Sequence, residues 1–281
     1  MSENRNIYNG RRLSDGYPDL GDLAHRQKLQ SARGRPDHRP TLRKALTYYD
    51  RLIELRKGCS ILVIGCGPEP VTIQFLLESG FDARGVEPVR SFVESAAVFL
   101  GERERVVEGS AEAIPFPDGS QQLVMMESVL EHVDSPGRSL AEICRVLAPG
   151  GILHVLTTNR LRFSLLGRNG EFNVPFYNWL PALVRECYVF DHLHYRPRLA
   201  NFTQRPAVHW FTYAELCRLG REAGFAQFYS ILDLVRREDP GIAGSLFRRT
   251  VLHAVQRRPW LRALALTQIG GSVIMWKRSA G

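Results

Sequence analysis

A run of apolar residues that ends in a glycine-rich turn limits the folds open to this chain most strongly. Ile61-Leu62-Val63-Ile64 has no polar break, and Gly65-Cys66-Gly67 follows it directly. A short continuous apolar run is typical of a strand buried on both faces of a parallel sheet. Glycine suits the turn because it adopts positive φ and lets a ligand approach the backbone. We therefore predict a buried strand that leads into a ligand-facing turn.

Strand and helix patterns alternate along the rest of the chain. Helical patterns run from Thr41 up to Gly58, over 71–79 and 89–100, through a Leu- and Val-rich segment after Met126, and over 213–223. Strand patterns occupy 60–64, 83–86, 105–108, 123–126, 152–156, 227–234 and 272–277. This alternation predicts an α/β fold in which helices cover both faces of a parallel sheet.

The distribution of residue types suggests how the chain is organised. Residues 1–40 mix Arg, Asp, Gly and Pro with little periodicity, which indicates an irregular N-terminal arm before a domain at 41–281. Aromatic residues, arginines and histidines crowd residues 160–210, which we interpret as an insertion after the fifth strand. A basic helical stretch is expected at about 244–266.

Composition excludes several classes of protein. With 44% hydrophobic and 23% charged residues, the 281-residue chain is not a disordered or collagen-like polymer. No segment approaches the roughly 18 apolar residues of a membrane span, and the polar N-terminus lacks a signal-peptide core. The five cysteines form no CxxC pair, so we expect a cytoplasmic protein without a disulfide framework. The net charge of +8 favours polyanionic partners.

Glu87 ends the second predicted strand, twenty residues after Gly67. From this position a carboxylate accepts hydrogen bonds from ribose hydroxyls, and the helix N-terminus after the turn favours a polar or anionic ligand. Pro70 stands where a dinucleotide-binding pattern has its third glycine, which disfavours a dehydrogenase. The alternative is an ordinary strand–helix turn with a solvated Glu87.

Four segments, in order, carry a resemblance to a known family. They are Ile61–Gly67, Ala111–Ser120, Ser128–Val133 and Glu142–Gly151. Together they resemble the motifs of class I S-adenosylmethionine-dependent methyltransferases of the type 11 group, over about residues 58–158. The resemblance implies a Rossmann-like, doubly wound, seven-stranded sheet and S-adenosyl-L-methionine as cofactor.

The resemblance also implies cofactor-binding residues at the ends of several strands. The methionine part would lie over the backbone of Gly65-Cys66-Gly67, and Glu87, followed by Pro88, would hold the ribose. The adenine would lie beside Ser110-Ala111-Glu112, and the backbone of Met126-Glu127 would face the sulfonium.

Three residues depart from the family pattern. Val63 replaces a frequent acid, Glu69 a glycine and Ser110 an aspartate. A non-catalytic protein that retains the fold is therefore an alternative.

Methylation of a hydroxyl calls for a general base, and histidine suits that role at neutral pH. His132 follows the fourth strand, near the sheet edge where such folds bind ligands, although a structural role fits it equally well. His192 and His194 in the insertion are further candidates, and they share a side only if their segment is extended.

Some relatives bind a divalent metal through Glu-x-x-Glu-His. Here Ser128 takes the first ligand position, and Glu127 would point about 100° away if the segment were helical. We predict no metal.

The predicted insertion offers either an acceptor site under a lid or a small core of its own. The aromatic and histidine residues concerned are Phe176, Tyr177, Trp179, Tyr188, Phe190, His209, Trp210 and Phe211. Four arginines could bind an anionic group of the substrate or could be solvated charges: Arg160, Arg162, Arg168 and Arg185.

The basic stretch near the C-terminus combines apolar residues at helical spacing with arginine pairs, and no acid occurs from Gly241 to Gly281. Such a helix either lies on an anionic membrane surface or packs its apolar face on the sheet. The first arrangement would make the protein peripheral to the membrane.

These observations predict a methyltransferase that O-methylates a small-molecule, sugar or lipid-linked acceptor. The basic charge keeps RNA methylation as an alternative. We do not expect a nucleic-acid partner, because the sequence has no separate RNA-binding module.

Overall fold

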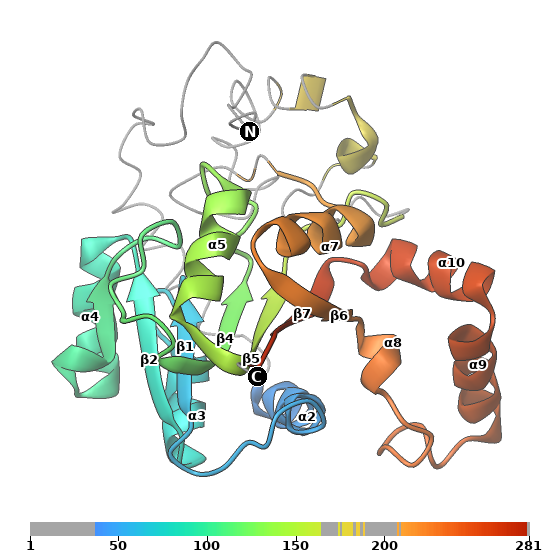
Figure 1. Cartoon of the computed structure of the whole chain (residues 1–281), viewed down its shortest axis with the longest axis horizontal. Helices are drawn as coiled ribbons and strands as arrows, with labels where there is room; N and C mark the ends of the chain where they lie inside the picture. The colour runs from blue at the N-terminus through green and yellow to red at the C-terminus, as the bar shows by residue number, and fades with distance from the viewer. Residues whose placement is uncertain are drawn as a thin grey trace.

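The computed structural model describes residues 37–163, 174, 176–181, 184–185, 188, 207 and 209–279. Most of the predicted arm and much of the predicted insertion lie outside these residues, including His192, His194, Phe190 and Arg168. Figure 1 shows the described elements around a central sheet.

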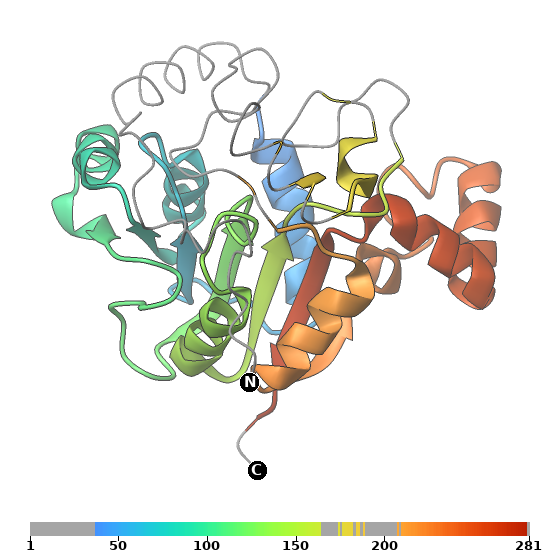
Figure 2. The ribbon, with the colours of Figure 1, turned by 90° about the horizontal axis from the view of Figure 1, so that it is seen from above.

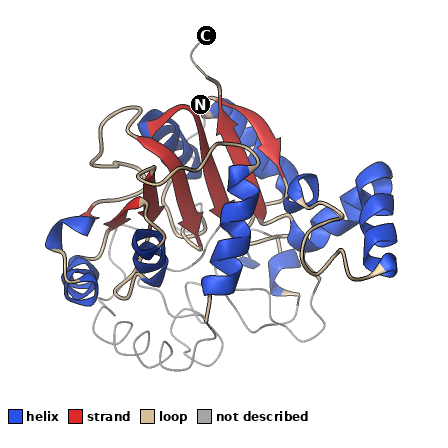
Figure 3. Cartoon of the chain, turned by 90° about the horizontal axis from the view of Figure 1, so that it is seen from below, coloured by secondary structure: helices blue, strands red, loops and turns tan. Residues whose placement is uncertain are grey.

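The sheet has seven strands in the order β3-β2-β1-β4-β5-β7-β6. Figure 3 shows this sheet at the centre of the molecule. Neighbouring strands from β3 to β5 are parallel, and β7 runs antiparallel to both β5 and β6. The strands are β1 (Ser60–Ile64), β2 (Asp82–Glu87), β3 (Val106–Glu108), β4 (Gln121–Glu127), β5 (Leu147–Leu156), β6 (Phe225–Tyr229) and β7 (Ser272–Lys277). The predicted α/β class and the Rossmann-like seven-stranded sheet are confirmed.

Helices cover both faces of the sheet (Figure 2). One face packs against α2 (Arg39–Asp50), α3 (Val71–Glu78) and α4 (Arg90–Leu100). The other packs against α5 (Pro136–Val146) and α7 (Tyr213–Glu222). The described residues also form two 3-10 turns, η1 (Arg103–Arg105) and η2 (Tyr177–Trp179). Three further helices are α8 (Ile231–Leu234), α9 (Leu246–Arg257) and α10 (Pro259–Ile269).

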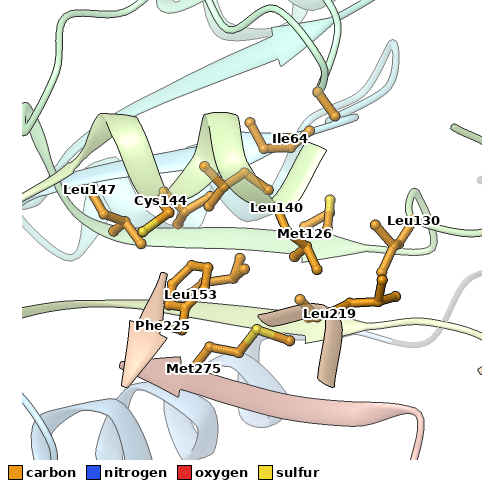
Figure 4. Packing of buried hydrophobic residues seen from close by; sticks show 14 of the residues in the cluster. Ile64, Met126, Leu130, Leu140, Cys144, Leu147, Leu153, Leu219, Phe225 and Met275 are labelled. Carbon is orange, nitrogen blue, oxygen red and sulfur yellow. The ribbon is translucent and has the colours of Figure 1, made fainter. Parts of the chain in front are cut away.

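Alternation along β1 explains the two layers of core. Ile61 and Val63 belong to the α2–α3 layer, whereas Leu62 and Ile64 belong to the α5–α7 layer, because successive side chains of a strand point to opposite faces. Figure 4 shows the second layer, in which Leu140 of α5 and Leu219 of α7 meet side chains of the central strands. A strand buried on both faces needs the unbroken apolar run of the sequence.

The structure corrects the predicted segment after Met126. Residues 128–135 are not helical, and the next helix, α5, begins only at Pro136. Ser128 has a φ of 54°, outside the right-handed helical region, and the Ser135 hydroxyl caps α5 by accepting the N–H of Arg138. The prediction that Glu127 points about 100° away from the metal-ligand positions assumed a helix in this segment, and that assumption was wrong.

Other element boundaries also differ from the predictions, and β5, predicted at 152–156, begins at Leu147. The predicted strand 227–234 ends at Tyr229, because Ser230 and Asp233 form a capping box that starts α8. The helix predicted from Thr41 to Gly58 covers Arg39–Asp50, with Pro40 in its first turn. The basic stretch folds as two helices, since Pro259 opens α10 directly after α9 ends.

The pair α9 and α10, here called the basic hairpin, lies at the edge of the molecule (Figures 1 and 2). Helix α9 packs mainly against α10 and α8, and Leu252 is its one buried residue. The alternative in which its apolar face packs on the sheet is therefore wrong. No helix within the described part of the chain is long and apolar enough to cross a membrane.

Candidate functional site

The turn after β1 is held in a conformation that favours glycine. Gly65 and Gly67 have φ values of 67° and 71°, in the left-handed region. A Cβ on Gly65 would lie 2.4 Å from Cγ2 of Val129, so the loop after β4 packs directly on the turn. The glycine turn therefore lies against the segment that follows β4.

Glu87 connects this turn to the end of β2. Its side chain is only 4% exposed, and its Oε2 accepts the backbone N–H of Gly67 at 2.9 Å. Its Oε1 accepts the N–H of Val89 at 3.2 Å, and the exposed Pro88 lies between them in sequence. A carboxylate offers about four acceptor positions, and hydroxyl groups are among the donors that it accepts. This arrangement fits the ribose of a nucleoside cofactor.

The loop after β3 is braced by helix α5. The Arg145 guanidinium donates to the carbonyls of Ile114 and Phe116 at 2.8 and 3.0 Å, and the Glu142 carboxylate accepts the N–H of Ile114. The hydrogen bond from Arg145 also lowers the pKa of Glu142. These contacts give the loop a defined path beside the glycine turn.

The three residues predicted beside the adenine differ in their surroundings. Ser110 is half-buried, and Ala111 is buried. The Glu112 carboxylate accepts the backbone N–H of Ser135 at 2.6 Å, which ties the loop to the start of α5. This bond gives Glu112 a positioning role.

The end of β4 brings a buried and an exposed residue together. Met126 is fully buried, whereas the Glu127 side chain is exposed, and partial loss of solvent around its carboxyl raises its pKa. Ser128 then turns the chain with its positive φ and donates its N–H to the carbonyl of Leu156 at 2.8 Å. This turn directs residues 128–131 toward the ends of β4 and β5.

A cavity of about 630 Å³ opens beside these strand ends. Its lining comes from α2, from the segments after β4 and β5, and from the end of α10 and the start of β7. Charged or polar members include Lys44, Tyr48, Glu131, His154 and Arg162, and apolar members include Ala45, Leu156, Ile231, Ile269 and Ile274. The cavity is therefore amphipathic.

Glu131 is the buried acid of this cavity, although it was not among the catalytic residues predicted from the sequence. Its side chain is 1% exposed, and burial raises its pKa to about 7. The Thr157 hydroxyl donates to its Oε2 at 2.6 Å. The sequence does place Glu131 directly before His132, in a segment between two predicted buried strands, and this position could have indicated it.

A second buried group joins α2 to the sheet beneath the cavity. The Tyr49 hydroxyl lies 2.6 Å from Nδ1 of His154, and Nε2 of His154 lies 3.0 Å from the Ser272 hydroxyl. Burial lowers the pKa of His154 to about 4, so this imidazole is neutral near pH 7. These bonds fix the position of α2, which forms one wall of the cavity.

His132 lies behind the cavity rather than among its lining residues. Its ring is largely buried, and its backbone N–H donates to the carbonyl of Val129. Within the described part of the chain, no three His, Cys, Asp or Glu side chains are gathered as a metal site would require.

The arginines and aromatics of the predicted insertion divide into different environments. Arg160 pairs with Glu215, and Arg185 stacks on Trp210, while Arg162 lines the cavity. Tyr177 and Trp210 are buried together in a small cluster that Tyr188 joins. Phe176 and Trp179 are half exposed and contact Phe163.

Two other predicted acceptor-site residues are held away from the cavity. Phe211 belongs to the α5–α7 core layer. His209 lies 2.9 Å from the Val133 carbonyl through its Nε2, and burial lowers its pKa to about 4. Like the other described aromatics of the insertion, neither is among the described lining residues.

The geometry therefore defines a class I methyltransferase fold with a glycine turn after β1 and a cavity beside the end of β4. Residues 62–155 match the family described as a methyltransferase domain. An uncharacterized methyltransferase of Schizosaccharomyces pombe is 32% identical over 34% of this chain and 39% of its own length. A probable S-adenosylmethionine-dependent methyltransferase of Mycolicibacterium smegmatis is 30% identical over 46% of this chain and 49% of its own length.

Among solved structures, a Haloferax volcanii complex of the Trm112 methyltransferase activator with a methyltransferase has a similar fold. The TM-score is 0.53 at 16% identity, with 94% of this chain and 97% of that chain covered. The segment from Leu62 to Val155 is therefore similar in sequence to methyltransferase domains, including that of a probable S-adenosylmethionine-dependent enzyme. The matched regions span less than half the length of these two curated relatives.

Replacement of Gly65 by alanine should disturb this site more than the same change at Gly58. Both glycines have positive φ, but a Cβ on Gly58 meets nothing within 4 Å. We expect Gly58→Ala to cost roughly 1–2 kcal/mol of unfolding free energy and Gly65→Ala roughly 2–4 kcal/mol, because strain and overlap with Val129 add. Urea titration of both variants measures the difference. Equal losses would contradict the close packing of the turn.

Glu131→Gln should stabilise the protein at neutral pH. The folded-state pKa of Glu131 is raised, so ionisation is easier in the unfolded state, and wild-type stability falls as the pH rises from about 4.5 to about 7. The neutral amide removes this cost and still accepts the Thr157 hydroxyl. We expect a gain on the order of 1–3 kcal/mol at pH 8 and little difference at pH 4. Urea titration across this pH range measures both, and a variant less stable at pH 8 would refute the assignment.

Proposed function

We propose that this chain is an S-adenosylmethionine-dependent methyltransferase that O-methylates a small-molecule, sugar or lipid-linked acceptor. The observation that carries the proposal is the buried Glu87 carboxylate bonded to the glycine turn, with the cavity beside the neighbouring end of β4. When bound, S-adenosylmethionine supplies an electrophilic methyl group on its sulfonium. The chain itself has to bind this cofactor, orient the acceptor and remove a proton.

The residues for cofactor binding follow from the turn and the braced loop. Glu87 would accept the ribose hydroxyls, and the glycine backbone at Gly65-Cys66-Gly67 would lie against the methionine part. Ser110 and Ala111 would border the adenine, on the loop that Arg145 holds in place. The backbone of Met126 and Glu127 would face the sulfonium from the end of β4.

The cavity supports a small or amphipathic acceptor. Its volume of about 630 Å³ lies within the range typical of small-molecule sites. Lys44 and Arg162 could hold an anionic or polar end of the acceptor, while Leu156, Ile231 and Ile269 offer apolar contacts. This mixed polar and apolar lining favours such an acceptor over nucleic acid. The main argument for nucleic acid is the basic net charge.

Glu131 is the general base in this proposal, in place of His132. It lines the cavity, and its raised pKa keeps an appreciable ionised fraction near pH 7 while making it a stronger base than an ordinary carboxylate. The Glu131 carboxylate would take the hydroxyl proton of a bound acceptor. Thr157 orients Glu131 through its Oε2.

Calorimetric titration tests the cofactor proposal without any acceptor. We expect wild type to bind S-adenosylmethionine and Glu87→Gln to bind it about 10–100-fold more weakly, since one charged hydrogen-bond acceptor is lost. Glu108→Gln is the matched control, because Glu108 is exposed and is the register partner of Glu87 on β3. Circular dichroism verifies that each variant is folded. A folded wild type that does not bind would refute the proposal.

The pH dependence of turnover distinguishes Glu131 from His132. With phenolic and sugar acceptors assayed by S-adenosylhomocysteine release, we expect wild-type kcat to rise with pH to a plateau above about 7. Glu131→Gln should lower kcat by about 100-fold or more with little change in KM, and should remove this rise. If His132→Gln removes the rise instead, His132 is the base.

A further inference from the structure

The basic hairpin exposes large apolar side chains that the fold leaves uncovered. Leu246 and Phe247 of α9 are 78% and 76% exposed, and Trp260 and Leu264 of α10 are 65% and 60% exposed. At 100° per residue, Leu246, Phe247 and Val251 fall within about 140° of the circumference of α9. Trp260 and Leu264, four residues apart, share one face of α10. Exposed apolar residues grouped in this way indicate a binding surface.

Positive charge surrounds these apolar side chains. Arg248, Arg249, Arg257 and Arg258 are exposed, and none of the ion pairs between described residues involves them. Arg262 pairs with Asp233, and no acid occurs in the sequence from Gly241 to Gly281. Partial desolvation and the charges of Arg237 and Arg257 lower the pKa of His253 on α9. The surface therefore complements a negatively charged partner.

We propose that the basic hairpin docks on an anionic lipid bilayer, with Phe247 and Trp260 at the level of the headgroups. Apolar and indole side chains among arginines are the combination that anchors a helix in a membrane interface. Electrostatic attraction to anionic lipids and burial of apolar area act together there. Neither helix crosses the bilayer in this arrangement.

The hairpin leads directly to the cavity. Helix α10 is about 16 Å long, and its last residues, Gln268 and Ile269, line the cavity while Trp260 lies at its first turn. Docking would thus bring the cavity within about one helix length of the lipid. The docking itself does not depend on the proposed methyltransferase activity.

Flotation of the full chain with lipid vesicles tests the proposal. We use vesicles of phosphatidylcholine alone and vesicles with 30% phosphatidylglycerol, at low and high salt. The expected result is binding to the anionic vesicles that weakens as salt screens the charges. Arg248→Gln/Arg249→Gln should weaken binding roughly 10–30-fold, since each arginine contributes near the surface. Arg56→Gln/Arg103→Gln, with the same change of net charge at exposed positions elsewhere, should not.

A second pair of variants separates apolar insertion from charge alone. Phe247→Ser/Trp260→Ser should reduce partitioning at least about 30-fold. Val98→Ser/Phe99→Ser removes exposed apolar residues from α4 and should leave binding unchanged. Calorimetry with S-adenosylmethionine in vesicle-free buffer verifies that all variants keep the cofactor site.

Three results would overturn the docking proposal. These are no binding to anionic vesicles, equal binding by the Phe247→Ser/Trp260→Ser variant, and a dimer in solution that the same variant converts to monomer. In the last case a second copy of the chain covers the surface. Loss of vesicle binding with intact cofactor binding leaves the proposed function standing, and the reverse result removes only the function.

Discussion

The hydrogen bond from the Gly67 N–H to the Glu87 carboxylate joins two strand ends that the rest of the site is built around. It places a buried negative charge against a turn whose glycines have positive φ. Because the turn also packs on Val129, the segment after β4 takes its position from the same contact. The glycine turn, the carboxylate and the wall of the cavity therefore form one connected unit at the carboxyl ends of the strands, where ligands of such sheets bind.

Around this unit, charges and hydrogen bonds hold loops that have little core of their own. Arg145 and Glu142 position the loop after β3, and Thr157 holds Glu131. Tyr49 and His154 keep α2 against the sheet. Each of these polar groups is partnered by a residue distant in sequence, so the shape of the site depends on the assembled sheet. The basic hairpin differs, because several of its large apolar residues, among them Phe247 and Trp260, stay exposed.

Much of the sheet was predictable because strand burial leaves a local pattern. The unbroken run Ile61–Ile64 and the final strand Ser272–Lys277 could be recognised from their residues alone. Boundaries failed where short polar interactions outweighed apolar periodicity. Ser230 and Asp233 begin a helix inside a predicted strand, and Ser128 turns the chain where a helix was expected. Such caps and single-residue turns depend on a few hydrogen bonds and leave weak sequence signals.

The sequence by itself determined the α/β class, the glycine turn and the acid at the end of β2, because each depends on residue type at short spacing. Only the tertiary structure decided that Glu131 lines the cavity while His132 lies behind it, since both residues stand side by side in the chain. It also decided that Leu246 and Phe247 of α9 stay exposed. Amphipathic spacing shows that a helix has an apolar face, but what covers that face depends on elements far away in the sequence.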